Sequence, residues 1–154
     1  MGVLFLVRGP AFAHGDVWAI LRALPSALVA GFAWRLAPQA DWPMHALAVV
    51  AVGGALTVSS LAALGRSFAI FPAARDVVER GPYRLVRHPA YLGEVVMVAG
   101  CGLAHAPSRG VLASAITVAL LAPRILDEET LLGRHPGYGA YRARVRFRLV
   151  PGLW

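Results

Sequence analysis

Lysine is absent from this sequence of 154 residues, and all fifteen of its basic side chains are arginines. Acidic residues number only eight, so the formal net charge is +7. A basic chain can bind nucleic acid, a membrane surface or acidic ligands. Because the chain is strongly apolar and carries no recognised nucleic-acid-binding motif, we expect anionic lipid headgroups as the counterpart and no nucleic acid.

Cysteine and signal-like segments are scarce as well. The single cysteine, Cys101, excludes an intrachain disulfide, and its place in the apolar run of residues 95–106 favours a buried structural side chain over a catalytic thiol. We predict no metal site. Residues 1–7 are apolar, but Arg8 follows them, whereas a secretory signal has its positive charge first.

Charge is missing from long stretches of the chain. Hydrophobic residues make up 58% of the sequence, against roughly 45–50% in a soluble domain. Residues 42–65 are 24 consecutive positions without a charged side chain, and a helix needs about 20 to cross a bilayer core. We therefore predict a membrane-spanning helix over residues 45–64. Its small residues are of the kind that let membrane helices approach closely: Gly53, Gly54, Ser59 and Ser60.

Two shorter apolar runs, residues 95–108 and 110–123, each contain 14 positions without charge. The turn signal between them predicts two helices that cross the membrane as a hairpin. The first helix is expected to start near Pro89, since proline is favoured in a first turn, and the second to run from about Ser108 past Leu132. Extended in this way, both helices are expected to be long enough to span.

A fourth span is predicted over about residues 17–36. Its apolar centre has only 12 residues without charge, and the arginines at its two ends, Arg22 and Arg35, can reach the interfaces. With four spans and cytoplasmic termini, thirteen arginines lie on the inner side and only Arg35 and Arg109 on the outer side. This asymmetry favours both the number of spans and the orientation.

The expected architecture is a single all-α integral-membrane domain of about four transmembrane helices. Residues 1–65 supply two of them, and residues 66–154 form a catalytic half with two more and a C-terminal tail. The arginine-only, alanine-rich composition is typical of a GC-rich bacterial genome, so we expect a bacterial inner membrane.

A first polar cluster, residues 81–94, precedes and enters the third span. After a Gly-Pro turn it gathers hydrogen-bond donors: Tyr83, Arg87, His88 and Tyr91. A helix N-terminus adds free backbone N–H groups and a positive dipole end, and such a terminus suits a carboxylate or a phosphate. The alternative is a juxtamembrane anchor, with arginine and tyrosine at the level of the headgroups.

A second cluster follows the last apolar run and contains Arg124 and three acids, Asp127, Glu128 and Glu129. Arg124 and Glu128 are four residues apart and share a helix face. An ordinary ion pair at a wet helix end is one interpretation. Ionisable groups at membrane depth usually serve function, however, and this group suits a cationic sulfonium ligand whose hydroxyl or amino groups donate to a carboxylate.

A third cluster, residues 138–151, alternates arginine with apolar side chains from Arg142 to Leu149, a period that suits a strand. Residues 138–144 could instead be helical. The simplest role is an interfacial segment on acidic headgroups, and direct contact with a cofactor is the alternative.

Together these clusters resemble a known family. The pattern is Arg87-His88-Pro89-x-Tyr91-x-Gly93, then Arg124-x-x-x-Glu128-Glu129, then Tyr138-x-x-Tyr141-x-x-x-Val145. It resembles the isoprenylcysteine carboxyl methyltransferase family and is similar to membrane phospholipid methyltransferases. The resemblance covers about residues 64–151.

The resemblance implies S-adenosylmethionine as cofactor, S-adenosylhomocysteine as product, and a cytoplasmic cofactor pocket built by the C-terminal half. The acceptor would enter laterally from the bilayer and meet Arg124. The implied cofactor contacts are Arg75, Asp76, Val77, Val78, Tyr83, Arg87, His88, Pro89, Ala90, Tyr91 and Glu128.

The expected function is therefore methyl transfer to a lipophilic or small acceptor, with Arg124 and Glu129 as catalytic residues. A carboxylate acceptor is favoured, since Arg124 can hold it and no base is needed. A phospholipid amine or a thiol is the alternative and would use Glu129 or His88 as base. A non-enzymatic four-helix membrane subunit is the other alternative. We expect the bilayer and the acceptor as partners, and no obligate protein partner.

Overall fold

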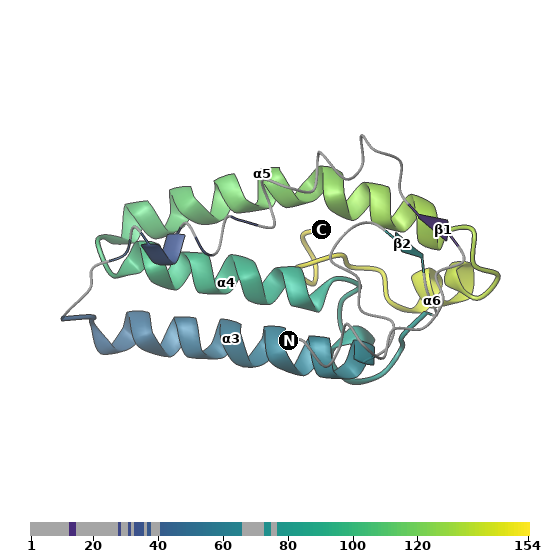
Figure 1. The fold of residues 1–154 in the computed structure, drawn as a ribbon, viewed down its shortest axis with the longest axis horizontal. Coiled ribbons are helices and arrows are strands. Elements are labelled where there is room, and N and C mark those ends of the chain that lie inside the picture. Colours follow the sequence, from purple (N-terminus) through teal and green to yellow (C-terminus); the bar gives the residue numbers. More distant parts are fainter. Residues whose placement is uncertain are drawn as a thin grey trace.

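The computed structural model describes two long stretches and several short ones: residues 13–14, 28, 31, 33–35, 37, 41–65, 73–74 and 77–154. Three long helices lie side by side in a layer, α3 (Met44–Leu64), α4 (Pro89–Leu103) and α5 (Pro107–Leu132) (Figure 1). At one end lie the 3-10 helix η2 (Gly81–Arg84) and the short helix α6 (Tyr138–Arg144). Apart from one antiparallel pair of two-residue strands, β1 (Ala13–His14) and β2 (Ala73–Ala74), the described elements are helical, as expected.

Helix α3 matches the predicted span over residues 45–64. It has 21 residues, and its mean hydropathy reaches 2.1. Only 11% of its most apolar window is buried, and large side chains such as Val52 and Val58 are exposed. The core helix of a soluble protein would be mostly buried, so this surface is suited to lipid.

Helix α5 is the second helix that is long and apolar enough to cross a membrane, with 26 residues and a mean hydropathy of 1.6. It begins at Pro107 and ends at Leu132, close to the predicted bounds. Helix α4 begins at Pro89 as predicted, but its 15 residues rise only about 22 Å, less than the about 30 Å of a bilayer core. The prediction that α4 reaches spanning length is thus not met.

The remaining span, predicted over residues 17–36, lies almost entirely outside the described residues. Two of the four expected spans are therefore found, and the four-span count and the orientation stay predictions.

Glycine lets α3 and α4 approach backbone to backbone. A Cβ atom built on Gly93 would lie 2.3 Å from Thr57 Oγ1 and 2.7 Å from the Gly53 carbonyl oxygen. The predicted packing role is confirmed for Gly53, whereas a Cβ atom on Gly54 would make only an ordinary contact with Met97 Sδ at 3.8 Å. Ser60 is fully buried and Ser59 is exposed. Any larger side chain at Gly53 or Gly93 would push the helices apart.

Helices α4 and α5 touch at their hairpin end and separate toward the other. At the hairpin, a Cβ atom on Gly102 would lie 2.5 Å from Gly110 Cα. Farther along, the C-terminal tail lies between the two helices (Figure 1), and Leu149 packs on Leu121 and Ile125 of α5. The polar residues gather where the helices are apart.

Candidate functional site

The C-terminal tail holds the start of α4 through backbone hydrogen bonds. The Arg87 N–H donates to the Phe147 carbonyl oxygen and the His88 N–H to that of Arg148, both at 2.9 Å. The tail is helical over Tyr138–Arg144, one of the two conformations predicted for it. The strand predicted from Arg142 to Leu149 is not formed, since the backbone bends after the helix and the N–H groups of Arg148 and Leu149 donate to the Trp154 carbonyl oxygen. The backbone bonds of Arg87 and His88 fix the Arg-His-Pro segment against the tail.

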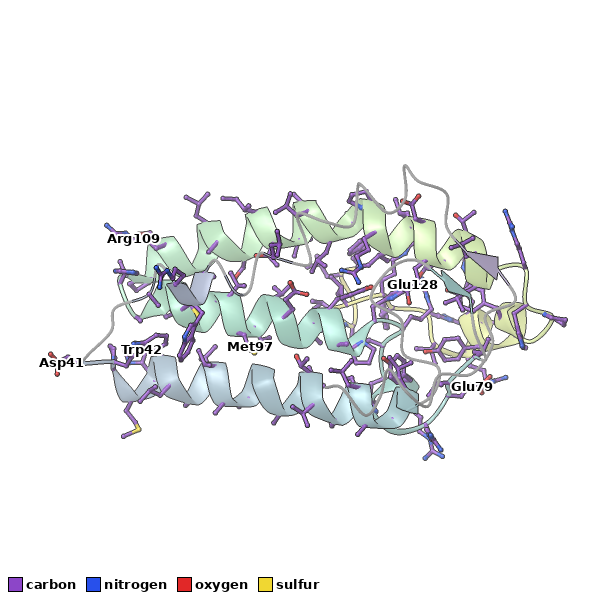
Figure 2. The ribbon with its side chains drawn as sticks, viewed as in Figure 1. Asp41, Trp42, Glu79, Met97, Arg109 and Glu128 are labelled. Carbon is purple, nitrogen blue, oxygen red and sulfur yellow. The ribbon has the colours of Figure 1, made fainter. Side chains whose placement is uncertain are left out.

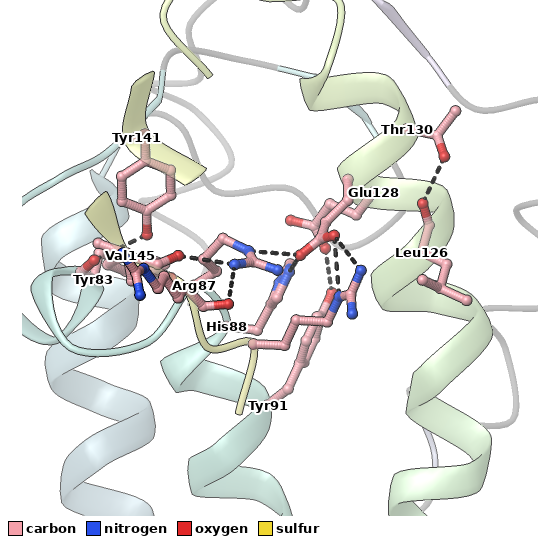
Figure 3. A network of polar contacts seen from close by, with 12 residues as sticks. Tyr83, Arg87, His88, Tyr91, Leu126, Glu128, Thr130, Tyr141 and Val145 are labelled. Carbon is pink, nitrogen blue, oxygen red and sulfur yellow. Dashed lines mark hydrogen bonds and ion pairs between the residues drawn. The ribbon is translucent and has the colours of Figure 1, made fainter. Parts of the chain in front are cut away.

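Glu129 is the centre of a buried ionic network. Two members of this network, Arg87 and His88, are labelled in Figure 3. Glu129 Oε1 accepts from Arg87 Nε at 2.8 Å and lies 3.2 Å from His88 Nε2, and Glu129 Oε2 accepts from Arg148 Nε at 3.1 Å. Arg87 also donates to the carbonyl oxygens of Val145 and Arg146. The Arg87 and Glu129 side chains are only 4% and 7% exposed. Such a pair is tolerated in the interior because its hydrogen-bonding capacity is used.

Tyr91 connects α4 to the other acid of α5. Its hydroxyl donates to Glu128 Oε2 at 2.8 Å, and the buried Arg124 places its guanidinium 5.0 Å from the centre of the Tyr91 ring. The His88 ring stacks on the Tyr91 ring with 5.7 Å between centroids. The first and second predicted clusters therefore meet, with an aromatic ring between an arginine and a histidine.

Three buried tyrosines line the neighbouring region. The Tyr141 hydroxyl donates to the Tyr83 carbonyl oxygen at 2.9 Å. The Tyr138 side chain is 3% exposed, and within the described part of the chain its hydroxyl has no hydrogen-bond partner. Burial, and then the negative charge of Glu129, raises the pKa of Tyr138 to about 12. The hydroxyl is thus a neutral donor without an acceptor, which is costly unless a ligand or a water supplies one.

Tyr138 was missed as an individual site residue. The only sequence signal for it is the Tyr-x-x-Tyr pattern of the tail, and that pattern does not show which of the two hydroxyls is satisfied.

The remaining predicted cofactor residues that the structure describes lie around this end of the bundle. Val77 packs on the cluster of Tyr138 and Tyr141, while Val78 is half-buried. Pro89 is fully buried at the start of α4, and the Ala90 carbonyl oxygen accepts from Thr57 Oγ1 at 3.5 Å. Arg75 and Asp76 lie outside the described residues. Seven predicted residues are thus gathered at one end of the helix layer: Tyr83, Arg87, His88, Tyr91, Arg124, Glu128 and Glu129.

A pocket of about 470 Å³ lies on a different face of α5. Its walls are Leu126, Glu129, Thr130, Gly133, Arg134, Arg142 and Arg148. Among the predicted site residues only Glu129 lines it, so this hollow is not the predicted cofactor pocket, which stays a prediction. Over the described residues, no group of three or more His, Cys, Asp or Glu side chains is placed to hold a metal ion.

The sequence model of the phospholipid methyltransferase family matches residues 42–138, from just before α3 to the first residue of α6. This is more than half of the chain and includes the first two polar clusters. The match confirms the resemblance drawn from those clusters. No individual curated protein matches the chain.

Proposed function

Since this chain belongs to the phospholipid methyltransferase family, a family of membrane methyltransferases, we propose that it transfers a methyl group from S-adenosylmethionine to a lipophilic or small acceptor. The proposed site lies at the end of the helix layer where α4, α5 and the tail meet. We place this end, and both termini, on the cytoplasmic side of a bacterial inner membrane, following the distribution of the arginines.

The observation that carries the proposal is the joining of two motifs through Tyr91. The Tyr91 hydroxyl bonds Glu128, and its ring lies under the guanidinium of Arg124. Arg124 and Glu128 follow Tyr91 by 33 and 37 positions in the sequence. The three side chains thus form one polar surface between two apolar helices. Ionisable side chains grouped at such depth usually serve ligands rather than stability.

The residues fit the proposed cofactor, which when bound supplies an activated methyl group on a sulfonium sulfur. Glu128 offers a carboxylate for hydroxyl or amino groups. The N–H groups of Ala90 and Tyr91 stand in the first turn of α4, without acceptors of their own in the helix, and suit a carboxylate. The Tyr138 hydroxyl adds a buried donor that lacks an acceptor among the described residues. Arg75, Asp76, Val77 and Val78 are proposed as further contacts.

On the acceptor side we assign Arg124. A cation can hold a carboxylate acceptor in line with the methyl group without quenching it, and correct placement supplies much of the rate. An amine or thiol acceptor would need a base, and His88 is the candidate, because Glu129 at 3.2 Å can orient its ring. Both carboxylate oxygens of Glu129 are engaged by cationic side chains. Its contacts therefore support a role in positioning these side chains.

Titration calorimetry with S-adenosylhomocysteine tests the cofactor site. We expect wild-type protein in detergent to bind it and Glu128→Gln to bind about tenfold or more weakly, since a charge-assisted hydrogen bond is worth about 1.5–3 kcal/mol. Asp41→Asn is the matched control, because Asp41 lies at the far end of the molecule (Figure 2). Unchanged affinity in Glu128→Gln would contradict the assigned contact. No binding by the wild type would favour a non-enzymatic membrane subunit.

A methyl-transfer assay over three acceptor classes tests the acceptor side. With fatty carboxylates, phospholipid amines and thiols offered separately, we expect turnover with the carboxylate. Arg124→Gln should then raise the KM for the carboxylate more than it lowers kcat. Turnover with an amine that survives Arg124→Gln would move the assignment to the phospholipid-amine alternative.

A further inference from the structure

Three arginines from three separate segments converge on the pocket beside the end of α5. Arg134 follows that helix, Arg142 belongs to α6, and Arg148 comes from the tail after α6. Leu126 is the apolar wall residue of the pocket. It precedes Arg134 by eight residues, which corresponds to about 12 Å along a helix axis. A pocket of about 470 Å³ is in the range of small-ligand sites.

The described walls of this pocket carry more positive than negative charge. Glu129 is the one acid among the wall residues that the structure describes, and both of its carboxylate oxygens are already engaged by Arg87, His88 and Arg148. Among the residues that the structure describes, Arg134 and Arg142 have neither an ion pair nor a hydrogen bond through their side chains. An entering anion would therefore meet two uncompensated guanidinium groups, which stay charged at every physiological pH.

We propose that this pocket is a binding site for a phosphate-bearing anion. Guanidinium groups match the oxygens of a phosphate in a fork geometry that an ammonium group cannot provide. The last carbonyl groups of α5 disfavour an anion, and the excess of arginine offsets them. The phosphate can belong to a membrane lipid, with its chains along Leu126, or to a water-soluble molecule.

The proposed site is separate from the acceptor and cofactor surface. Arg124 and Glu128 lie on the face of α5 that meets Tyr91, whereas Leu126, Thr130 and Arg134 line the pocket. The proposed anion site does not depend on methyl transfer by the chain, and its test measures binding without turnover.

Arg148 connects the two surfaces. It lines the pocket, bonds Glu129, and lies 5.3 Å from the centre of the Trp154 ring. An anion that draws the Arg148 guanidinium into the pocket would weaken its bond to Glu129 and change the surroundings of the indole. Trp154 is thus a built-in reporter of occupancy.

The test is a titration of the detergent-purified protein with dihexanoyl phosphatidic acid, inorganic phosphate and uncharged dihexanoylglycerol. Calorimetry gives the affinities. Fluorescence of a Trp18→Phe, Trp34→Phe, Trp42→Phe variant follows Trp154 alone. The pocket variant is Arg134→Gln, Arg142→Gln. Its matched control is Arg84→Gln, Arg146→Gln, which removes the same charge from exposed positions outside the pocket.

We expect saturable binding of phosphatidic acid, none of dihexanoylglycerol, and a change in Trp154 emission. The pocket variant should bind about tenfold or more weakly, since each lost charge-assisted bond is worth at least tenfold, and the control should bind like the wild type. Equal binding of inorganic phosphate would identify a soluble source, and binding of phosphatidic acid alone would identify a lipid. Absence of binding, equal losses in both variants, or competitive displacement by S-adenosylhomocysteine would each overturn the proposal.

Discussion

At one end of the helix layer α4 and α5 meet backbone to backbone at Gly102 and Gly110, and at the other end the C-terminal tail holds them apart. The first end is apolar and depends on residues close together in the chain. The second end is polar and depends on contacts between residues far apart in the chain, such as Arg148 with Glu129, 19 positions apart, and Arg87 with Val145, 58 positions apart. The comparison teaches that the close end of the helix pair depends on glycines, whereas the divergent end depends on buried charges.

The largest effect is expected from Glu129→Ala at the polar end. This change leaves the buried Arg87 and the partly exposed Arg148 without their shared carboxylate, and breaking a buried pair such as that of Arg87 costs about 3–5 kcal/mol. Thermal unfolding in detergent should show a large drop in midpoint. The control is Glu79→Ala, because the ion pair of Glu79 with Arg144 is about half exposed and should contribute little. Equal drops for the two variants would mean that the network is not what holds the polar end.

The next effect concerns the glycine end and is tested by Gly102→Ala. The new methyl group would lie 2.5 Å from Gly110 Cα, a backbone atom that can move only with its helix. Overpacking of this kind costs about 1–3 kcal/mol, so the unfolding midpoint should fall by less than in Glu129→Ala. Gly139→Ala is the matched control, since a Cβ atom there meets nothing within 4 Å. If Gly102→Ala unfolded like its control, the close backbone contact at the hairpin would be wrong.

Much of the glycine end could be predicted from the sequence. The charge-free run of residues 42–65 predicted α3, and Pro89 predicted where α4 begins. The turn signal after residue 106 placed the start of α5 at about Ser108, one residue after its observed start at Pro107. The length of α4 could not be predicted. Helix α4 ends at Leu103, next to the hairpin. Where it ends depends on the close contact between Gly102 and Gly110, which the sequence pattern does not show.

The sequence predicts which residues form the polar end, but not which of them bond to one another. Spacing of four residues placed Arg124 and Glu128 on one helix face, and both do meet Tyr91. That Glu129 would be held by Arg87 and Arg148 depends on the path of the tail, which no local pattern describes. The pocket lined by Arg134, Arg142 and Arg148 could not be predicted for the same reason, since these arginines come from separate segments.

A smaller effect is expected from Tyr141→Phe in the tyrosine cluster of the polar end. The Tyr141 hydroxyl donates to the carbonyl oxygen of Tyr83 in a buried position. Its removal loses one hydrogen bond and leaves the carbonyl without that donor, for a cost of about 1 kcal/mol. The unfolding midpoint should fall measurably, and affinity for S-adenosylhomocysteine should hold. A midpoint equal to that of the wild type would indicate that water replaces this bond.

The smallest effect on stability, and the most informative contrast, is expected from Tyr138→Phe. Tyr138 packs beside Tyr141 with 6.0 Å between ring centroids, yet its hydroxyl has no partner in the described part of the chain. Deleting an unsatisfied buried hydroxyl removes a desolvation cost, so the unfolding midpoint should stay constant or rise slightly. If the hydroxyl donates to the cofactor, calorimetry should at the same time show about tenfold weaker binding of S-adenosylhomocysteine. Lower stability with unchanged affinity would instead assign the hydroxyl to a buried water, and would make Tyr138 a structural residue like Tyr141.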